Sequence, residues 1–223
     1  MKISRFSVLF LLISAAAAHA VDFPAPAKAK TIVQVFHSYS WDNTAGWVVL
    51  EGVKSLRETF DAEGRILSRE LFHEGSVPIE TTRYEYSETG HRRTTYNGKS
   101  QVVRYASVEK TDGGARETIH RPDGAIVAIY ETEFDRDGSP LLSEYRDPQG
   151  WLVWRIAYSY DRKRDCTMVS YCNPDGSLAF LSTYRYEGAD EAGNWSTRTE
   201  YAAYADVKTR PKDIVSRSVE YRE

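Results

Sequence analysis

This sequence of 223 residues has few cysteines and methionines, two of each. It also has no excess of positive charge, with 29 cations against 32 acids. A nucleic-acid partner is not expected, because such partners usually require a basic surface. No apolar run of about 20 residues follows the N-terminal one, so we predict no membrane span in the mature chain. The sequence has no Gly-x-Ser-x-Gly motif and no histidines at metal-ligand spacing. We therefore predict a protein that is not an enzyme, with no catalytic residues, no metal and no cofactor.

Residues 1–20 are typical of a cleaved secretory signal. Lys2 and Arg5 precede an apolar run that ends in Ala18-His19-Ala20. We predict a mature chain that begins at Val21 and is exported, so that it is periplasmic or secreted. Without Lys2 and Arg5, 27 cations face 32 acids and the net charge changes from −3 to −5. A leader rich in Pro and Ala, residues 21–31, follows the signal.

The two cysteines, Cys166 and Cys172, would meet an oxidising compartment after export. They flank Thr167 to Tyr171, which has the pattern of one extended strand. Six residues of strand span about 20 Å, whereas a disulfide needs Cα atoms within about 7 Å. No disulfide is therefore expected between Cys166 and Cys172, and both are expected on one face of the strand.

A repeat of 26 residues organises the chain. The turn quartets Arg121–Gly124, Asp147–Gly150 and Asn173–Gly176 follow one another at this spacing, and Asn97-Gly98-Lys99 precedes them by the same step. An aromatic residue followed by an acid recurs between the turns, at Phe134-Asp135, Tyr160-Asp161 and Tyr186-Glu187. A fixed period of this length indicates a repeat architecture.

Two turns in each 26 residues predict two strands per unit. The fold class is therefore all-β: an antiparallel meander of repeated β-hairpins that forms one extended, twisted or curled sheet of about a dozen strands. The hairpin repeats cover residues 56–201. Residues 32–55 do not match the repeat and are expected to cap the first edge, and residues 202–223 are expected to form a C-terminal strand or cap.

Aromatic residues alternate with polar ones along the predicted strands, as in Trp154, Ile156, Tyr158 and Tyr160. Successive side chains of a strand point to opposite faces, so one face of the sheet is predicted to be aromatic. That face must curl on itself, pack on a second sheet or hold a ligand. The candidate binding residues on neighbouring strands are Trp151, Trp154, Tyr158, Tyr184, Tyr186 and Trp195, and the alternative is that they fill the core of a curled sheet.

The segments Phe60-Asp61-x-x-Gly64, Phe134-Asp135-x-x-Gly138 and Tyr158-x-Tyr160-Asp161 resemble the YD repeat of the RHS family. The resemblance covers residues 56–201 and implies strand-turn-strand units that build curved sheet in bacterial secreted or surface proteins. The self-cleaving core of the large family members has no counterpart here. Tyr96-Asn97-Gly98-Lys99 is also similar to MORN-like tandem-repeat antitoxin proteins, and neither family supplies a catalytic residue.

The aromatic face is the feature that suggests a function. We predict a non-enzymatic secreted or periplasmic binding or scaffold protein, which contacts an unknown protein or a cell-envelope glycan through an aromatic sheet face or edge. One alternative is an immunity or inhibitor protein that neutralises a toxin. Another is a periplasmic carrier of an apolar ligand such as a lipid.

Overall fold

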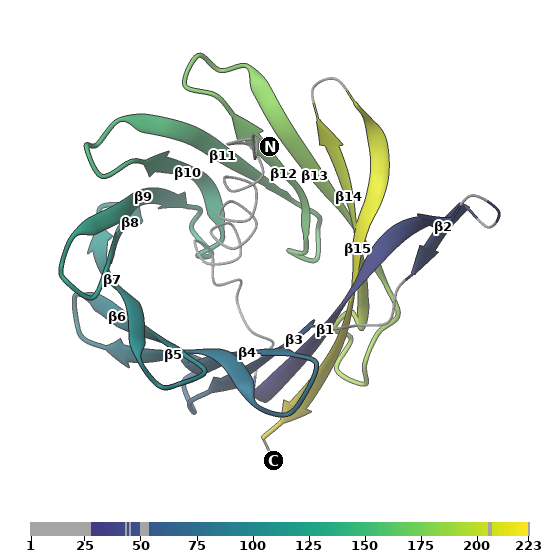
Figure 1. The fold of residues 1–223 in the computed structure, drawn as a ribbon, viewed down its shortest axis with the longest axis horizontal. Helices are drawn as coiled ribbons and strands as arrows, with labels where there is room; N and C mark the ends of the chain where they lie inside the picture. Colours follow the sequence, from purple (N-terminus) through teal and green to yellow (C-terminus); the bar gives the residue numbers. More distant parts are fainter. Residues whose placement is uncertain (1–27, 43, 45, 50–53, 205–206, 223) are drawn as a thin grey trace, which may run out of the picture.

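The computed structural model describes residues 28–42, 44, 46–49, 54–204 and 207–222, which form fifteen β-strands (Figure 1). The described chain is all-β, and from β3 onwards each strand pairs antiparallel with the next, as the hairpin meander predicts. β2 pairs with the end of β1 beyond the ring of the other strands. The strands are β1 (Ala29–Asp42), β2 (Gly46–Val49), β3 (Lys54–Phe60), β4 (Ile66–His73), β5 (Pro78–Tyr86), β6 (Gly90–Asn97), β7 (Val102–Thr111), β8 (Gly114–His120), β9 (Ile126–Phe134), β10 (Pro140–Arg146), β11 (Leu152–Tyr160), β12 (Cys166–Cys172), β13 (Leu178–Glu187), β14 (Thr197–Tyr204) and β15 (Val207–Tyr221).

The prediction of one extended, twisted or curled sheet is wrong, because the sheet closes into a barrel. β15 pairs antiparallel with β1 over nine residue pairs, from Ala29 opposite Tyr221 to Ser38 opposite Asp213. β1 and β3–β15 thus form a closed ring of 14 antiparallel strands (Figure 1). Closure pairs the backbone N–H and C=O groups that an open sheet would leave unpaired at its two edges. The segments predicted as the N-terminal cap, 32–55, and the C-terminal cap, 202–223, contain the strands that make this closure.

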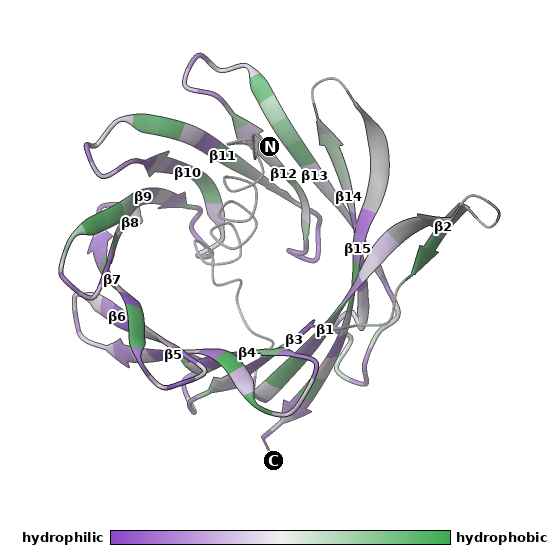
Figure 2. Cartoon of the chain, in the orientation of Figure 1, coloured by the Kyte–Doolittle hydropathy of each residue, from purple (hydrophilic) through white to green (hydrophobic). Residues whose placement is uncertain are grey.

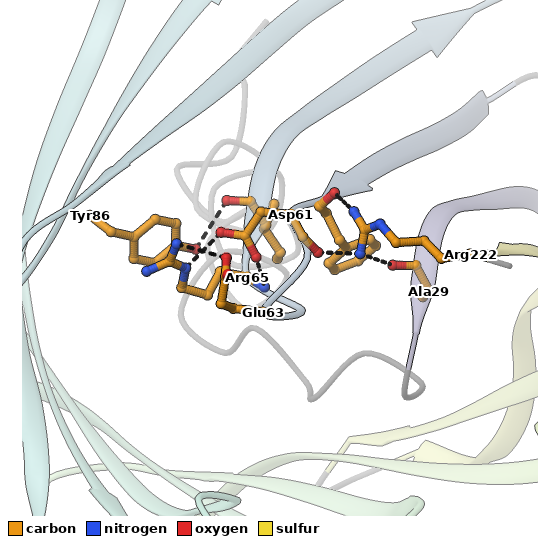
Figure 3. Close-up of polar contacts among 8 residues, drawn as sticks. Ala29, Asp61, Glu63, Arg65, Tyr86 and Arg222 are labelled. Atoms are coloured by element: carbon orange, nitrogen blue, oxygen red, sulfur yellow. Dashed lines mark hydrogen bonds and ion pairs between the residues drawn. The ribbon is translucent and has the colours of Figure 1, made fainter.

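The C-terminal residues fasten the closing strand to both of its neighbours. The Arg222 guanidinium donates to the backbone oxygens of Ala29, Phe60 and Asp61, so it reaches across β1 to the hairpin of β3 and β4 (Figure 3). The Tyr221 hydroxyl donates to the Asp190 carboxylate in the loop between β13 and β14. Asp61 is itself held by Arg65, whose guanidinium also lies over the Tyr86 ring.

The barrel has two walls of different composition. Residues that are opposite each other in an antiparallel pair point to the same face. The partners Ser143, Ile156, Tyr171 and Phe180 mark the inner wall, whose residues are mostly buried, and hydrophobic and hydrophilic residues alternate along the strands (Figure 2). The partners Glu144, Arg155, Cys172 and Leu178 mark the outer wall.

Each 26-residue unit contributes one turn to each end of the barrel. We call rim A the end that carries the turns at 61–65, 87–89, 112–113, 135–139, 161–165 and 188–196. Rim B carries the turns at 74–77, 98–101, 121–125, 147–151 and 173–177. The two sequence patterns of the repeat therefore lie at opposite ends of the barrel. The aromatic-acid pairs lie at rim A, and the proline-containing quartets lie at rim B.

The predicted turn glycines lie in turns. Gly124, Gly150 and Gly176 have φ values of 89°, 86° and 86°, in the left-handed region that glycine adopts without steric cost. In the earlier copy the left-handed residue is Ser100, with φ of 59°, rather than Gly98. Asn97 and Ser100 therefore correspond to the first and fourth residues of the later quartets.

Cys166 and Cys172 lie on opposite walls, although they are six residues apart. Cys166 is opposite Tyr160 on the inner wall, and Cys172 is opposite Arg155 on the outer wall. A register shift between Ser159 and Tyr160, a β-bulge, places an extra residue in β12 and reverses the alternation. The expectation that both cysteines share one face is therefore wrong. Both are free thiols.

Candidate functional site

The structure places five of the six predicted binding residues together. Trp154 and Tyr158 lie on β11, Tyr184 and Tyr186 on β13, and Trp195 in the loop that follows β13. Trp151 is separate, because it ends the rim B turn before β11 and its side chain is 74% exposed. Tyr158 is buried, whereas Tyr184 and Tyr186 are half-buried.

The inner wall of β11–β13 carries an aromatic cluster, which we define by the buried residues Ile156, Tyr158, Cys166, Val169 and Tyr171. Partly buried rings pack around it, among them Trp154, Phe180 and Tyr184. The rings of Tyr171 and Phe180 have centroids 5.4 Å apart. Within the described residues, the buried indole nitrogen of Trp154 has no hydrogen-bond partner, so it is a free donor beside these rings.

An arginine–aromatic cluster, made of Tyr184, Tyr186, Trp195, Arg198 and Arg217, adjoins the aromatic cluster towards rim A. The Arg198 guanidinium carbon lies 5.0 Å from the Tyr184 ring centroid and 5.7 Å from that of Trp195. Arg217 lies 3.7 Å from the Trp195 centroid, and its Nε donates to the Trp195 carbonyl at 3.0 Å. The buried Nε of Arg198 has no hydrogen-bond partner among the described residues. It is a second free donor among rings.

Burial disfavours the charged forms of the titratable groups in these clusters. It raises the pKa of Tyr158 to about 12 and that of the Cys166 thiol to about 11. A protonated thiol is a poor nucleophile and a poor metal ligand. Burial lowers the pKa of Arg217, against the attraction of Asp165 and Asp190. The clusters therefore offer rings, neutral hydroxyls and guanidinium donors.

The inner wall of β3–β8 differs, because it carries buried charges that pair with one another. Arg69 donates to the Glu58 carboxylate at 2.6 and 2.9 Å. Arg93 pairs with Glu117, two strands away across the small side chain of Ala106. A second hydrophobic cluster, which includes Phe60 and Tyr84, lies on the same side, so this part of the interior combines paired charges with apolar side chains.

The outer wall carries a ladder of ion pairs across β8–β11. Arg116 lies 3.5 Å and Arg146 lies 3.0 Å from Glu131, and Arg155 lies 3.1 Å from Glu144. Arg146 also pairs with Glu144. The ladder makes this part of the outer wall strongly polar.

Among the described residues, no group of three or more His, Cys, Asp and Glu side chains could hold a metal ion. The described part of the chain also contains no helix with the length and hydropathy to cross a membrane.

Among solved structures, the barrel resembles in its architecture a porin-like protein. That protein, from Bacteroides uniformis, matches with a TM-score of 0.51 at 12% identity, over 86% of this chain and 98% of the other. A DUF1329 family protein from Desulfovibrio piger matches with a TM-score of 0.39 at 10% identity, over 86% of each chain. At 12% identity the first likeness shows a shared fold.

No family model and no curated protein matches the chain. The resemblance to YD repeats of the RHS family therefore stays a prediction, and so does the weaker one to MORN-like antitoxin proteins.

Arg198 and Arg217 are among the site residues that were not predicted from the sequence, as is Tyr171. Both arginines follow the loop at 188–196, which is longer than the other rim A turns and interrupts the 26-residue period. The alternation of Arg198, Glu200 and Ala202 on β14 was the available signal, because all three lie on the inner wall. Nothing in the spacing predicted that β15 would bring Arg217 beside Trp195.

Proposed function

We propose that this chain is an exported, non-enzymatic carrier, periplasmic or secreted, that holds an apolar ligand inside its barrel against the aromatic cluster. The observation that carries the proposal is the convergence of rings from neighbouring strands on the inner wall of a closed barrel. The ligand has an apolar body, which the rings contact, and an oxygen acceptor for the free donor of Trp154 or Arg198.

The width of the ring supports an internal ligand. Barrels of about eight strands are filled by side chains or hold one small ligand, and those of about 16–18 strands leave an aqueous channel. A ring of 14 strands lies between these limits. Small inner-wall residues such as Ser143, Ser182 and Ala202 keep side-chain volume low along part of the wall.

The closed sheet also makes the other uses of the aromatic face less favourable. Tyr158, Tyr171 and Ile156 are buried on the inner wall, where a large protein or glycan surface would not reach them. The pairing of β1 with β15 occupies the two edges of the ring that could have received a partner strand, and the four-residue β2 keeps one unpaired edge outside the ring. The ion pairs on the outer wall of β8–β11 support a barrel surrounded by water there, because barrels that span a membrane face lipid with an apolar band.

The test starts from protein purified without denaturation. We expect native mass spectrometry to find a copurifying lipid, and the delipidated protein to bind cis-parinaric acid, a fluorescent fatty acid, with saturation. The two cysteines then locate the site. With Cys172→Ser, alkylation of Cys166 by N-ethylmaleimide at mildly alkaline pH should reduce binding of the probe, and bound probe should slow the alkylation. With Cys166→Ser, alkylation of Cys172 on the outer wall should leave binding unchanged.

Near-ultraviolet circular dichroism of each alkylated protein checks that the barrel is intact. A protein that carries no lipid and does not bind the probe would overturn the proposal. Binding that is equally sensitive to alkylation of either cysteine would place the ligand outside the aromatic cluster, and would also contradict it.

A further inference from the structure

Exposed apolar side chains gather at one end of the barrel. Large hydrophobic residues that are at least one-third exposed lie on or beside successive rim B turns, as in Val102, Val103, Ile126, Val127, Trp151 and Leu178. Val77 and Ile79 extend the set to the turn between β4 and β5, with exposures of 70% and 46%. We call these eight residues the apolar collar.

The collar is a product of the repeat. At rim B, five consecutive hairpins carry a register shift, in which two residues of the following strand oppose one residue of the preceding strand. Val102 and Val103 oppose Tyr96 in this way, and Ile126 and Val127 oppose His120. Tyr96 and His120 belong to the outer wall, so each bulge adds two neighbouring apolar side chains to the outside of the rim.

Rim A has the opposite character. Residues 161–165 are all charged, and ion pairs join its turns, such as Arg164 with Asp135 at 2.6 Å. Leu67 and Leu141, each 45% exposed, are the large apolar side chains near this end that reach a similar exposure within the described residues. The barrel is therefore polarised along its axis.

We propose that the apolar collar docks the barrel, rim B first, onto the surface of a lipid bilayer of zwitterionic phospholipid. The turns that carry the collar all belong to the same end of a closed ring, so their side chains meet one flat apolar phase together (Figure 1). A peptide or a single helix would contact one side of the ring and leave the rest exposed. An exposed apolar surface of this extent is typical of a protein or membrane contact.

Aromatic rings in the collar and beside it fit the same partner. Trp151 is the most exposed large hydrophobic side chain among the described residues, at 74%, and tryptophan favours the boundary between headgroups and acyl chains. Tyr105 and His120 stack on the outer wall with centroids 4.8 Å apart, directly beside the collar. The ion pairs of β8–β11 follow the collar on the outer wall, away from rim B. Because charged pairs do not enter the acyl chains, they limit the depth at which the collar enters the bilayer to about 5–10 Å, the depth of an interfacial anchor.

The charges at rim B select the lipid. Its described turns hold two cations, Lys99 and Arg121, and four acids, Glu74, Asp123, Asp147 and Asp175. This net charge of −2 is repelled by an anionic surface. Binding is therefore expected to be at least as strong on zwitterionic vesicles as on anionic ones, and to persist at high salt.

Flotation of the purified protein with phosphatidylcholine vesicles tests the proposal, with parallel vesicles that contain phosphatidylglycerol. The test variant carries Val77→Ser, Ile126→Ser and Trp151→Ser at rim B. The control carries Leu67→Ser and Leu141→Ser at rim A, which removes two apolar side chains that are each 45% exposed. We expect the partition coefficient to fall by about tenfold or more in the test variant, because the lost apolar area drives binding, and to be unchanged in the control.

Trp151→Ser alone provides a milder variant, since its side chain is mostly exposed and its loss leaves the barrel packing intact. We expect a smaller loss of partitioning in the same direction. Wild-type protein that stays with the unbound fraction would overturn the proposal, and so would an equal loss in the rim A control. A wild-type oligomer that becomes a monomer in the rim B variant, measured by light scattering without lipid, would assign the collar to contacts between copies instead.

Discussion

At the scale of single residues, the first residue of most turns fixes the backbone that follows it. The Asp147 carboxylate accepts from the amides of Gln149 at 3.0 Å and Trp151 at 2.9 Å. Asp135, Asp161 and Asp190 accept from the amides two and four residues later in the same way, and Asn97 does so with its side-chain oxygen. The acid of the aromatic-acid pair is thus explained by the turn that it begins, except at Glu187, where two further residues precede Asp190.

Asp147→Ala should destabilise the barrel by about 1 kcal/mol, because two turn amides lose their acceptor. Asp147→Asn should be nearly neutral, since an amide oxygen fills this role at Asn97. Arg121→Ala is the matched control. Arg121 holds the equivalent position in its turn, but its exposed side chain does not accept from the turn amides. Asp123 takes that role, because its carboxylate accepts from the Ala125 amide. Urea denaturation measures the three differences, and an equal loss for Asp147→Ala and Arg121→Ala would contradict the role of the carboxylate.

At the scale of the hairpin, a tyrosine that ends the strand before a rim A turn ties its own hairpin to an earlier one in three of the units. The Tyr86 hydroxyl donates to the carbonyl of Ile66, that of Tyr160 to Pro140, and that of Tyr186 to Cys166, in each case 20 residues back. The acceptor is always the first residue of the strand after the preceding hairpin of the same kind. The tyrosine therefore fixes how consecutive hairpins sit against each other at rim A.

Tyr160→Phe removes one of these contacts, a hydrogen bond of 2.8 Å, and should lower the free energy of unfolding by about 1 kcal/mol. Tyr96→Phe on the outer wall is the control, because the ring of Tyr96 contacts Arg83 and its substitution leaves that contact in place. Hydrogen exchange should show faster opening of the β9–β10 and β11–β12 hairpins in Tyr160→Phe. Unchanged exchange there would show that packing of the ring, rather than the hydroxyl, joins the hairpins.

At the scale of the whole molecule, closure depends on contacts between the two ends of the chain. Lys30 pairs with Glu220 at 2.7 Å across 190 residues, and the inner-wall residues Ile32 and Val219 are directly opposite each other. Arg222 then extends the contact to the hairpin of β3 and β4 (Figure 3). The ring is closed by its least repetitive strands.

Arg222→Ala should therefore loosen the seam between β1 and β15. Hydrogen bonds of a charged donor contribute about 1.5–3 kcal/mol, and the three backbone oxygens that Arg222 contacts would lose theirs. We expect faster amide exchange in β1 and β15, with β9–β12 unaffected. Arg185→Ala on the outer wall, whose side chain is 70% exposed, should leave exchange at the seam unchanged. A uniform rise across all strands would contradict a local fastening by Arg222.

The repeat made the hairpins and the aromatic face predictable from the sequence, because turn residues and rings recur at a constant step. It did not predict closure, which needs β1 and β15 to pair although neither belongs to the repeat. The same limit hid Arg198 and Arg217, which meet Trp195 only once β14 and β15 are placed in the ring. The predicted face for Cys172 failed for a local reason, since one bulge reverses the alternation of β12.

A ring made of interchangeable hairpins and two specialised ends has an adjustable circumference. Duplication of one unit, such as residues 147–172, would insert two strands without altering which residues point inwards or which end each turn occupies. The terminal strands would still find each other, because their complementarity lies in their own residues. Internal diameter can thus change in fixed increments while the seam and the two rims keep their chemistry.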